Sequence, residues 1–137
     1  MISQLSLILH YLIQLHSIPS QRFGYWKEQV AHLYQPLDPA VIRLVKQVTD
    51  VAKDKGIEVF MCGEMAAAAH HIPLLLGLGL DELSMNPQSI PEIKRVIRTL
   101  NMRDAQDFVQ QALKKKTARG VFGLVKEAFG DIFDNRY

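Results

Sequence analysis

The residue in this sequence most suited to covalent or proton-transfer chemistry is Cys62. It follows the apolar-rich run 57–61 and precedes Gly63 and Glu64. A thiol takes part in nucleophilic or redox chemistry when a nearby base or cation lowers its pKa. His32 is a candidate base, provided that folding brings it to the cysteine. The alternative interpretation of Cys62 is a small buried hydrophobic side chain, which is what most lone cysteines are.

The histidines do not show the spacing of a metal site. His70 and His71 are adjacent, so on a helix their side chains point about 100 degrees apart. They therefore do not form the i, i+4 pair that chelates a metal from one helix face. We predict that both are surface residues.

Composition indicates a soluble, folded protein of ordinary size. The 137 residues fit one domain, and 48% hydrophobic with 22% charged residues is typical of a globular chain. The net charge of +2 is too small to indicate nucleic-acid binding, and the basic run 114–116 is typical of a solvated helix end. A single cysteine excludes an internal disulfide and indicates a reducing, cytoplasmic location.

The apolar N-terminal stretch does not predict a membrane segment. Residues 2–15 are too short to span a bilayer and are interrupted by Gln4, His10 and Gln14. They also lack the basic start and small-residue cleavage site of a signal peptide. We therefore expect no membrane partner.

The order of predicted elements indicates an α/β fold. Asp38 and Pro39 begin a helix that Gly56 ends. Ser89 is the expected N-cap of a later helix, and Asn101 is expected to stop it. The remaining predictions are a strand over 57–62, a helix over 65–78 that is broken or restarted near Pro73, a strand over 82–85, and helices around 89–100, 105–112 and 121–128.

Two strands joined through a helix must pair in parallel. Two short parallel strands form a poor sheet, because both edges stay open and parallel sheets are normally larger and covered on both faces. The pattern therefore predicts a piece of a larger α/β fold, for which a barrel is a natural parent.

Several runs in the sequence resemble a known family. They are VAHLYQPLDP (30–39), MCGEMA (61–66), PLLLGLGLDELSM (73–85) and SIP (89–91). Together they resemble the end of the phosphoenolpyruvate (PEP)-binding barrel of Enzyme I, from the bacterial PEP:sugar phosphotransferase system. Pyruvate phosphate dikinase and PEP synthase share the Cys-Gly-Glu core, but the Ser-Met and Ser-Ile-Pro runs favour Enzyme I. The resemblance extends over roughly residues 28–115.

The resemblance implies a fold and a division of the chain. The family fold is a (β/α)8 TIM barrel of about 250 residues. This chain would supply a partial barrel: the last two parallel strands with flanking and C-terminal helices. Residues 29–137 are then the C-terminal part of the barrel domain of a PEP-utilising enzyme. Residues 1–28 are a divergent segment, which we interpret as a shifted reading frame or an unrelated start.

The resemblance also implies a reaction. The family transfers the phosphoryl group of PEP to a histidine with the help of Mg²⁺, and the enolate of pyruvate that leaves must gain a proton at carbon. Cys62 matches the family's proton donor. A thiol with a reference pKa of about 8.5 keeps its proton near neutrality but can release it. The C-terminal end of a barrel strand is also where such a group is expected.

The family's phosphate and metal ligands are not matched. Its Gly-Thr-Asn-Asp run, whose aspartate binds Mg²⁺, has no counterpart in residues 1–28, where the nearest placement gives His10 and Tyr11. A tyrosine does not replace a carboxylate for this cation. Arg22 could match the arginine that grips the phosphate, if an insertion at about 23–27 is allowed; the alternative is a solvated surface arginine. Mg²⁺ is thus implied as cofactor, with its ligands not found in this chain.

Two further departures lie beside the cysteine. Residues 67–69 are alanines where the family usually has Gly-Asp-Pro, and Phe60 stands where a glycine is usual. Only the proton donor is clearly kept, and phosphoryl transfer depends on positioning and charge neutralisation. We therefore expect an Enzyme I-like phosphotransferase fragment that is inactive alone.

Two other functions stay open. The chain could be a non-catalytic interaction or dimerisation module derived from that barrel, as a homodimer or with a subunit that completes it. It could also be a free-standing thiol enzyme or redox sensor that uses Cys62. PEP and pyruvate are the ligands that the resemblance implies, and neither a nucleic acid nor a membrane is expected.

Overall fold

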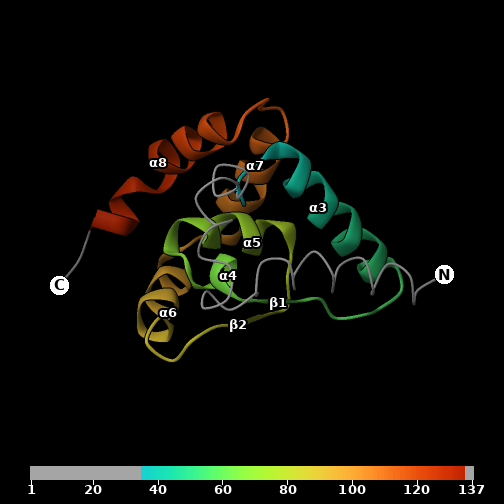
Figure 1. The fold of residues 1–137 in the computed structure, drawn as a ribbon, viewed down its shortest axis with the longest axis horizontal. Helices are drawn as coiled ribbons and strands as arrows, with labels where there is room; N and C mark the ends of the chain where they lie inside the picture. The colour runs from blue at the N-terminus through green and yellow to red at the C-terminus, as the bar shows by residue number, and fades with distance from the viewer. Residues whose placement is uncertain (1–34, 135–137) are drawn as a thin grey trace, which may run out of the picture.

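A sheet of two parallel strands lies along one side of the protein (Figure 1), in a computed structural model that describes residues 35–134. β1 (Phe60–Cys62) and β2 (Glu82–Ser84) pair in parallel, with Phe60 opposite Glu82 and Cys62 opposite Ser84. The predicted α/β class and parallel pairing are confirmed. Arg22, His32 and the segment 1–28 lie outside the described residues.

Both strands are shorter than the predicted ranges 57–62 and 82–85. The Asp81 carboxylate accepts the backbone N–H of Val59 at 2.8 Å, and the Asp81 N–H donates to the Val59 carbonyl at 2.9 Å. Beyond this end of the two strands, one of the two hydrogen bonds is therefore made by a side chain and the other by the backbone. Ile57, two residues upstream, is 46% exposed and belongs to no strand.

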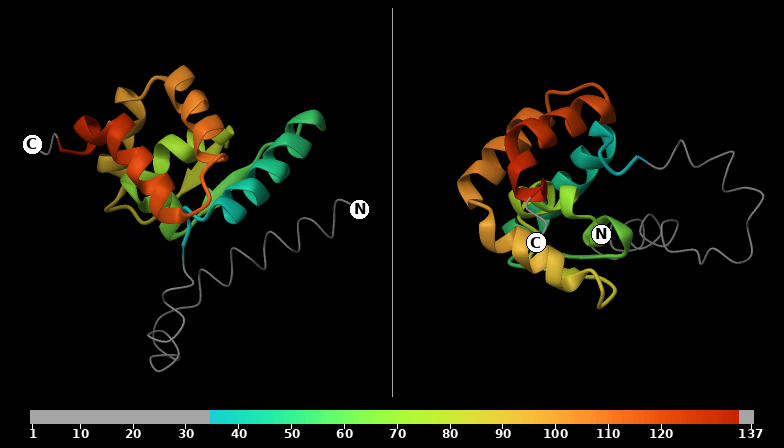
Figure 2. Two further views of the ribbon diagram at one scale, coloured as in Figure 1. Left: turned by 90° about the horizontal axis from the view of Figure 1, so that it is seen from above. Right: turned by 90° about the vertical axis from the view of Figure 1, so that its left-hand side faces the viewer.

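The first described helix, α3 (Pro39–Asp54), begins as predicted. The Asp38 carboxylate accepts the N–H of Ala40 at 2.8 Å, and the proline occupies the first turn, where its missing N–H costs nothing. Figure 2 shows α3 reaching out to one side of the other helices. The apolar side chains of α3 are only partly buried, because Leu44 and Val51 are 48% and 45% exposed.

The predicted helix over 65–78 consists of three pieces. They are α4 (Glu64–Ala67), the 3₁₀ turn η2 (Ala69–His71) and α5 (Ile72–Leu78). The break comes at Ala68, whose ψ of 116° is extended. Of the two predicted outcomes at Pro73, a fresh helix is confirmed, with the proline in its first turn and Gly79 ending it in the left-handed conformation.

Three helices complete the fold: α6 (Ile90–Thr99), α7 (Met102–Ala112) and α8 (Ala118–Asp134). Ser89 is the N-cap of α6, as predicted, but its side chain makes no capping hydrogen bond, because its hydroxyl donates to the Asn86 side chain at 3.1 Å. Asn101, which was predicted to stop α6, follows the C-cap residue Leu100. It caps α7 by accepting the N–H of Arg103 at 2.8 Å.

The core lies between α5 and the helices around it. Ile72, Leu74 and Leu75 of α5 are fully buried. Gly77 lets α5 approach α7 closely, because a Cβ there would overlap the carbonyl oxygen of Ala105. The α5–α7 contact is thus set by a residue without a side chain.

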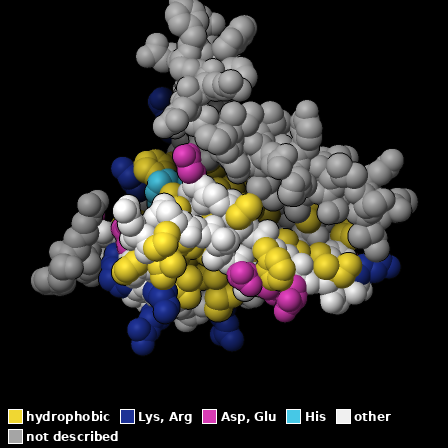
Figure 3. Space-filling model, turned by 60° about the horizontal axis from the view of Figure 1, so that its bottom comes forward, with side chains coloured by type: hydrophobic (Ala, Val, Ile, Leu, Met, Phe, Trp, Pro, Cys, Tyr) yellow, Lys and Arg dark blue, Asp and Glu magenta, His cyan; other side chains and the backbone are white. Residues whose placement is uncertain are grey.

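Several large apolar side chains stay at the surface. Figure 3 shows hydrophobic side chains exposed on the side that carries the sheet. The exposed set is Leu44, Val51, Ile57, Phe60, Ile90, Ile97 and Met102. None of the helices within residues 35–134 is long and apolar enough to cross a bilayer.

Candidate functional site

Cys62 ends β1, and the backbone turns sharply after it. Gly63 has a φ of 92°, which favours glycine, and its N–H donates to the carbonyl of Ser84 at 3.2 Å. This bond extends the pairing of the two strands by one step, and α4 then begins at Glu64. The glycine beside the cysteine is therefore required by the backbone at the end of the strand.

The Cys62 side chain is exposed. The alternative of a small buried hydrophobic residue is therefore wrong. Met61, the preceding residue, is 6% exposed, so β1 alternates between a buried and an open face. Cys62 lies on the open face, where it can meet another molecule.

The register of the sheet brings four side chains to this open face. Phe60 and Cys62 come from β1, and their partners Glu82 and Ser84 come from β2. All four are exposed, Phe60 to 51%. These four residues thus offer a thiol, a hydroxyl, a carboxylate and an aromatic ring. They can supply a proton and a hydrogen bond, but none of the four is a cation that could neutralise a phosphate.

The described residues do not fit a magnesium ion. Within residues 35–134, no group of three or more His, Cys, Asp or Glu side chains is placed to hold a metal. Glu82 is a single carboxylate on its face, whereas Mg²⁺ requires several oxygen ligands in octahedral geometry. Arg22, the predicted phosphate ligand, lies outside the described residues, so its role stays a prediction.

The interpretation of Cys62 as an activated nucleophile gains no support in the described part of the chain. No residue of 35–134 forms a hydrogen bond with its thiol. His32, its candidate base, lies outside the described residues. A nucleophilic or redox role needs a base or a cation beside the sulfur.

His71 is buried and His70 is half-buried, so the prediction that both are surface residues is wrong for His71. His71 is 7% exposed, and its Nδ1 lies 3.2 Å from the carbonyl oxygen of Met65. Burial lowers its pKa to about 4, helped by the nearby charge of His70 and opposed by the Met65 bond. Burial also lowers the pKa of His70, whose ring packs edge-on against Phe122 with centroids 5.6 Å apart. His71 is buried and His70 half-buried because η2 packs against its neighbours, α8 among them.

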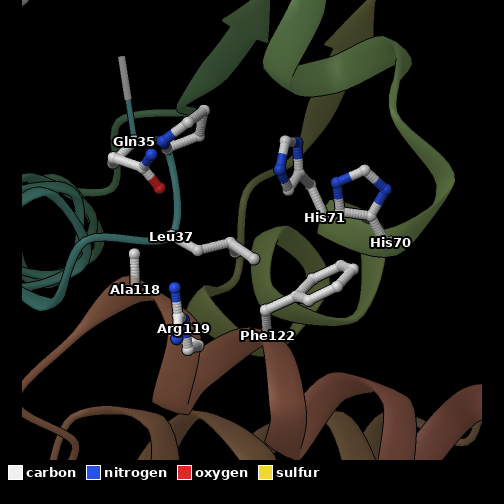
Figure 4. A pocket seen from close by; sticks show the side chains of 8 residues that line it. Gln35, Leu37, His70, His71, Ala118, Arg119 and Phe122 are labelled. Carbon is white, nitrogen blue, oxygen red and sulfur yellow. The ribbon is translucent and has the colours of Figure 1, made fainter. Parts of the chain in front are cut away.

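A cavity of about 480 Å³ lies beside these histidines. Its walls come from three separate parts of the chain, namely the segment before α3, η2 and the first turns of α8 (Figure 4). The lining residues are Gln35, Pro36, Leu37, His70, His71, Ala118, Arg119 and Phe122. No motif connects these segments, so nothing in the sequence could have grouped them.

More than half of the chain matches a known protein family. Residues 23–102 match a family described as "PEP-utilising enzyme, PEP-binding domain". The chain is 47% identical over 100 residues to the phosphoenolpyruvate-protein phosphotransferase of Staphylococcus carnosus, covering 73% of this chain and 18% of that protein.

Other relatives agree with this match. The phosphoenolpyruvate-protein phosphotransferase of Haemophilus influenzae is 44% identical over 100 residues (73% of this chain, 17% of that protein). The protein of that name in Bacillus subtilis is 44% identical over 102 residues (74% and 18%). The chain therefore spans less than a fifth of the length of these curated relatives.

Proposed function

We propose a function from one premise: the chain belongs to the family of PEP-utilising enzymes and matches their PEP-binding domain over residues 23–102. In this proposal it is a fragment of a phosphoenolpyruvate-protein phosphotransferase, and its inherited role is PEP-dependent phosphoryl transfer in the sugar phosphotransferase system. We further propose that β1 and β2 are the last two strands of a (β/α)8 barrel and that the protein acts in the cytoplasm. The parallel pairing of the two strands supports the barrel.

The exposure of Cys62 at the C-terminal end of β1 is the observation that carries this proposal. In (β/α)8 enzymes, catalytic groups lie at this end of the strands. Cys62 would give its proton to the carbon of the enolate that remains when PEP loses its phosphoryl group. The breaking S–H bond supplies the proton, and the enolate's electron pair forms the new C–H bond of pyruvate. Cys62 is thus the proposed proton donor.

The fragment is proposed to be inactive alone. Mg²⁺, the family's cofactor, would neutralise phosphate charge when bound, but residues 35–134 offer it no ligand cluster. Arg22 is proposed as the phosphate ligand. A thiol without a metal and several cations does not stabilise the transfer of a phosphoryl group.

A chimera tests the role of Cys62. The 100 residues of the S. carnosus enzyme that align with this chain would be replaced by the residues of this chain, and pyruvate release from PEP would be measured. We expect an active chimera, and a loss of at least about 100-fold in the Cys62→Ala chimera, which is typical of removing a general acid.

The neighbouring Ser84→Ala chimera is the matched control, because Ser84 lies opposite Cys62 on the same face. It should keep most of the pyruvate release. A Cys62→Ala chimera as active as its parent would refute the proton-donor role. A folded but inactive parent chimera would show that this chain has lost the inherited function.

The second candidate function is a non-catalytic interaction module. It is favoured by the exposed Phe60, Leu44 and Val51, since single domains rarely leave several large apolar side chains open. A second copy or a completing subunit would cover them. Analytical ultracentrifugation of the chain and of a Phe60→Ser, Val51→Ser variant tests this. A monomeric parent chain at high concentration would count against self-association.

A further inference from the structure

The cavity between η2, α8 and residues 35–37 has no role in the function proposed above. Cys62 is not among its lining residues. Its volume of about 480 Å³ lies within the range of small-molecule sites, which pair apolar walls with a few polar groups. Leu37 and Phe122 give it apolar walls, whereas His71 and Arg119 give it polar groups. The chemical class of a ligand for this cavity can therefore be inferred from those groups.

The α8 side of the cavity is positively charged. Arg119 lines it and forms no ion pair with any residue of 35–134. The exposed Lys114, Lys115 and Lys116 precede it, and residues 114–122 contain no Asp or Glu. The Lys115 side chain lies against the first turn of α8, because a Cβ at Gly120 would be 3.7 Å from its Cδ. Several cations and no carboxylate thus flank this wall.

The N-terminus of α8 adds to the positive potential on this side of the cavity. The helix has 17 residues, and its first turn contains no acidic side chain. The Thr117 hydroxyl accepts the N–H of Gly120 at 3.1 Å. Within the described part of the chain, the N–H groups of Ala118 and Arg119 have no acceptor. Free N–H groups and the helix dipole both favour an anion at this point.

A buried histidine faces the same cavity. His71 lines it but is only 7% exposed, and Figure 4 shows its ring turned toward the Gln35 side. A carbonyl can only accept, so Nδ1–H donates to the Met65 carbonyl and Nε2 carries the lone pair. Among residues 35–134 nothing donates to Nε2. With its pKa lowered to about 4, the ring is neutral at pH 7, so Nε2 is an acceptor that a bound molecule can donate to.

We infer that this cavity binds an organic phosphate that carries a hydroxyl group. The phosphate lies at Arg119 and the N-terminus of α8, and the hydroxyl donates to Nε2 of His71. A phosphate fits better than a carboxylate because it brings up to two charges to a wall with several cations. Leu37 and Phe122 contact the carbon skeleton. This site is separate from the open face that carries Cys62.

The test uses the full 137-residue chain and glycerol 3-phosphate as the probe. Its two halves, glycerol and inorganic phosphate, are measured separately by NMR titration of backbone amides and histidine rings. We expect glycerol 3-phosphate to bind with a Kd of about 1 mM or tighter and to shift Ala118, Arg119 and the His71 ring. Phosphate should shift only the α8 amides and bind more weakly, and glycerol should not bind.

Arg119→Gln should weaken binding of the probe about tenfold, as expected for the loss of one charged hydrogen bond. Arg103→Gln is the matched control, because Arg103 is an exposed arginine in the first turn of α7 that does not line the cavity. It should leave the Kd unchanged. Equal losses in both variants would show an adventitious ion only and overturn the inference, as would the absence of any shift at Ala118 and Arg119.

The place of the NMR shifts separates this inference from the proposed function. Shifts of the Cys62, Gly63 and Ser84 amides instead of those of α8 would place the probe at the proposed PEP site and overturn the inference. Shifts confined to Ala118, Arg119 and the His71 ring support the inference whatever the chimera experiment shows.

Discussion

Replacing Gly77 by alanine tests whether the close approach of α5 to α7 holds the fold together. In an open helix this change stabilises by about 1 kcal/mol, because alanine has the better helix propensity. At Gly77 the new methyl would overlap the carbonyl oxygen of Ala105 and lie 2.7 Å from Cγ2 of Val109. Ordinary carbon contacts are about 3.5–4.0 Å, so the two helices would have to move apart by roughly 1 Å.

Overpacking of this kind costs about 1–3 kcal/mol, and a backbone carbonyl cannot rotate away as a side chain would. We expect Gly77→Ala to lower the free energy of unfolding by about 1 kcal/mol, which is the middle of the overpacking range, about 2 kcal/mol, less the propensity gain of about 1 kcal/mol. In urea, this lowers the denaturation midpoint by about 0.5 M without a change in slope. Far-UV circular dichroism measures both quantities.

Gly123→Ala is the matched control. Gly123 lies inside α8, and no atom lies within 4 Å of the position its Cβ would take. It should stabilise the chain by about 0.5–1 kcal/mol through propensity alone. A Gly77→Ala chain with a midpoint equal to or above that of the parent would refute the close helix contact.

Three further predictions concern single residues: Asp81, His71 and Cys62. Asp81→Ala should cost about 1–2 kcal/mol in urea denaturation because the buried N–H of Val59 loses its acceptor, whereas Asp81→Asn, which keeps an amide oxygen, should cost less. The pKa of His71 is lowered from 6.5 to about 4 in the folded chain, so folding favours the neutral ring. The neutral ring should contribute roughly 3 kcal/mol to the free energy of unfolding, fully above pH 6.5, and this contribution should be lost as the pH falls toward 4. Urea midpoints at pH 7 and pH 4.5 should therefore differ less in His71→Gln than in the parent. Cys62→Ser should change stability by less than about 0.5 kcal/mol, and the parent thiol should react with a disulfide reagent in the folded state as fast as in urea, because it is exposed.

Where a single residue caps a helix start, the sequence predicted some of the capping hydrogen bonds but not all of them. Asp38 ahead of Pro39 predicted a capped helix, and the carboxylate does accept the N–H of Ala40. Ser89 ahead of Pro91 looked equally good, but its hydroxyl bonds to Asn86 instead. Whether a side chain caps a helix depends on the other hydrogen-bond partners that lie near it in the folded chain, and a residue's capping propensity does not include those partners.

The sequence also determined the family and the position of Cys62 at the end of a strand. It could not determine whether the thiol is buried, since that depends on which face of β1 the helices cover. The structure exposes it together with Phe60 and Glu82.

Only the tertiary structure decided the surroundings of His70 and His71. Their adjacency predicted divergent surface side chains on a helix, but they lie in a 3₁₀ turn that packs against α8, almost fifty residues further along the chain. The cavity beside them is built the same way, from 35–37, η2 and α8. Burial and cavities arise from packing between segments that are distant in the sequence, so they cannot be predicted from local residue patterns.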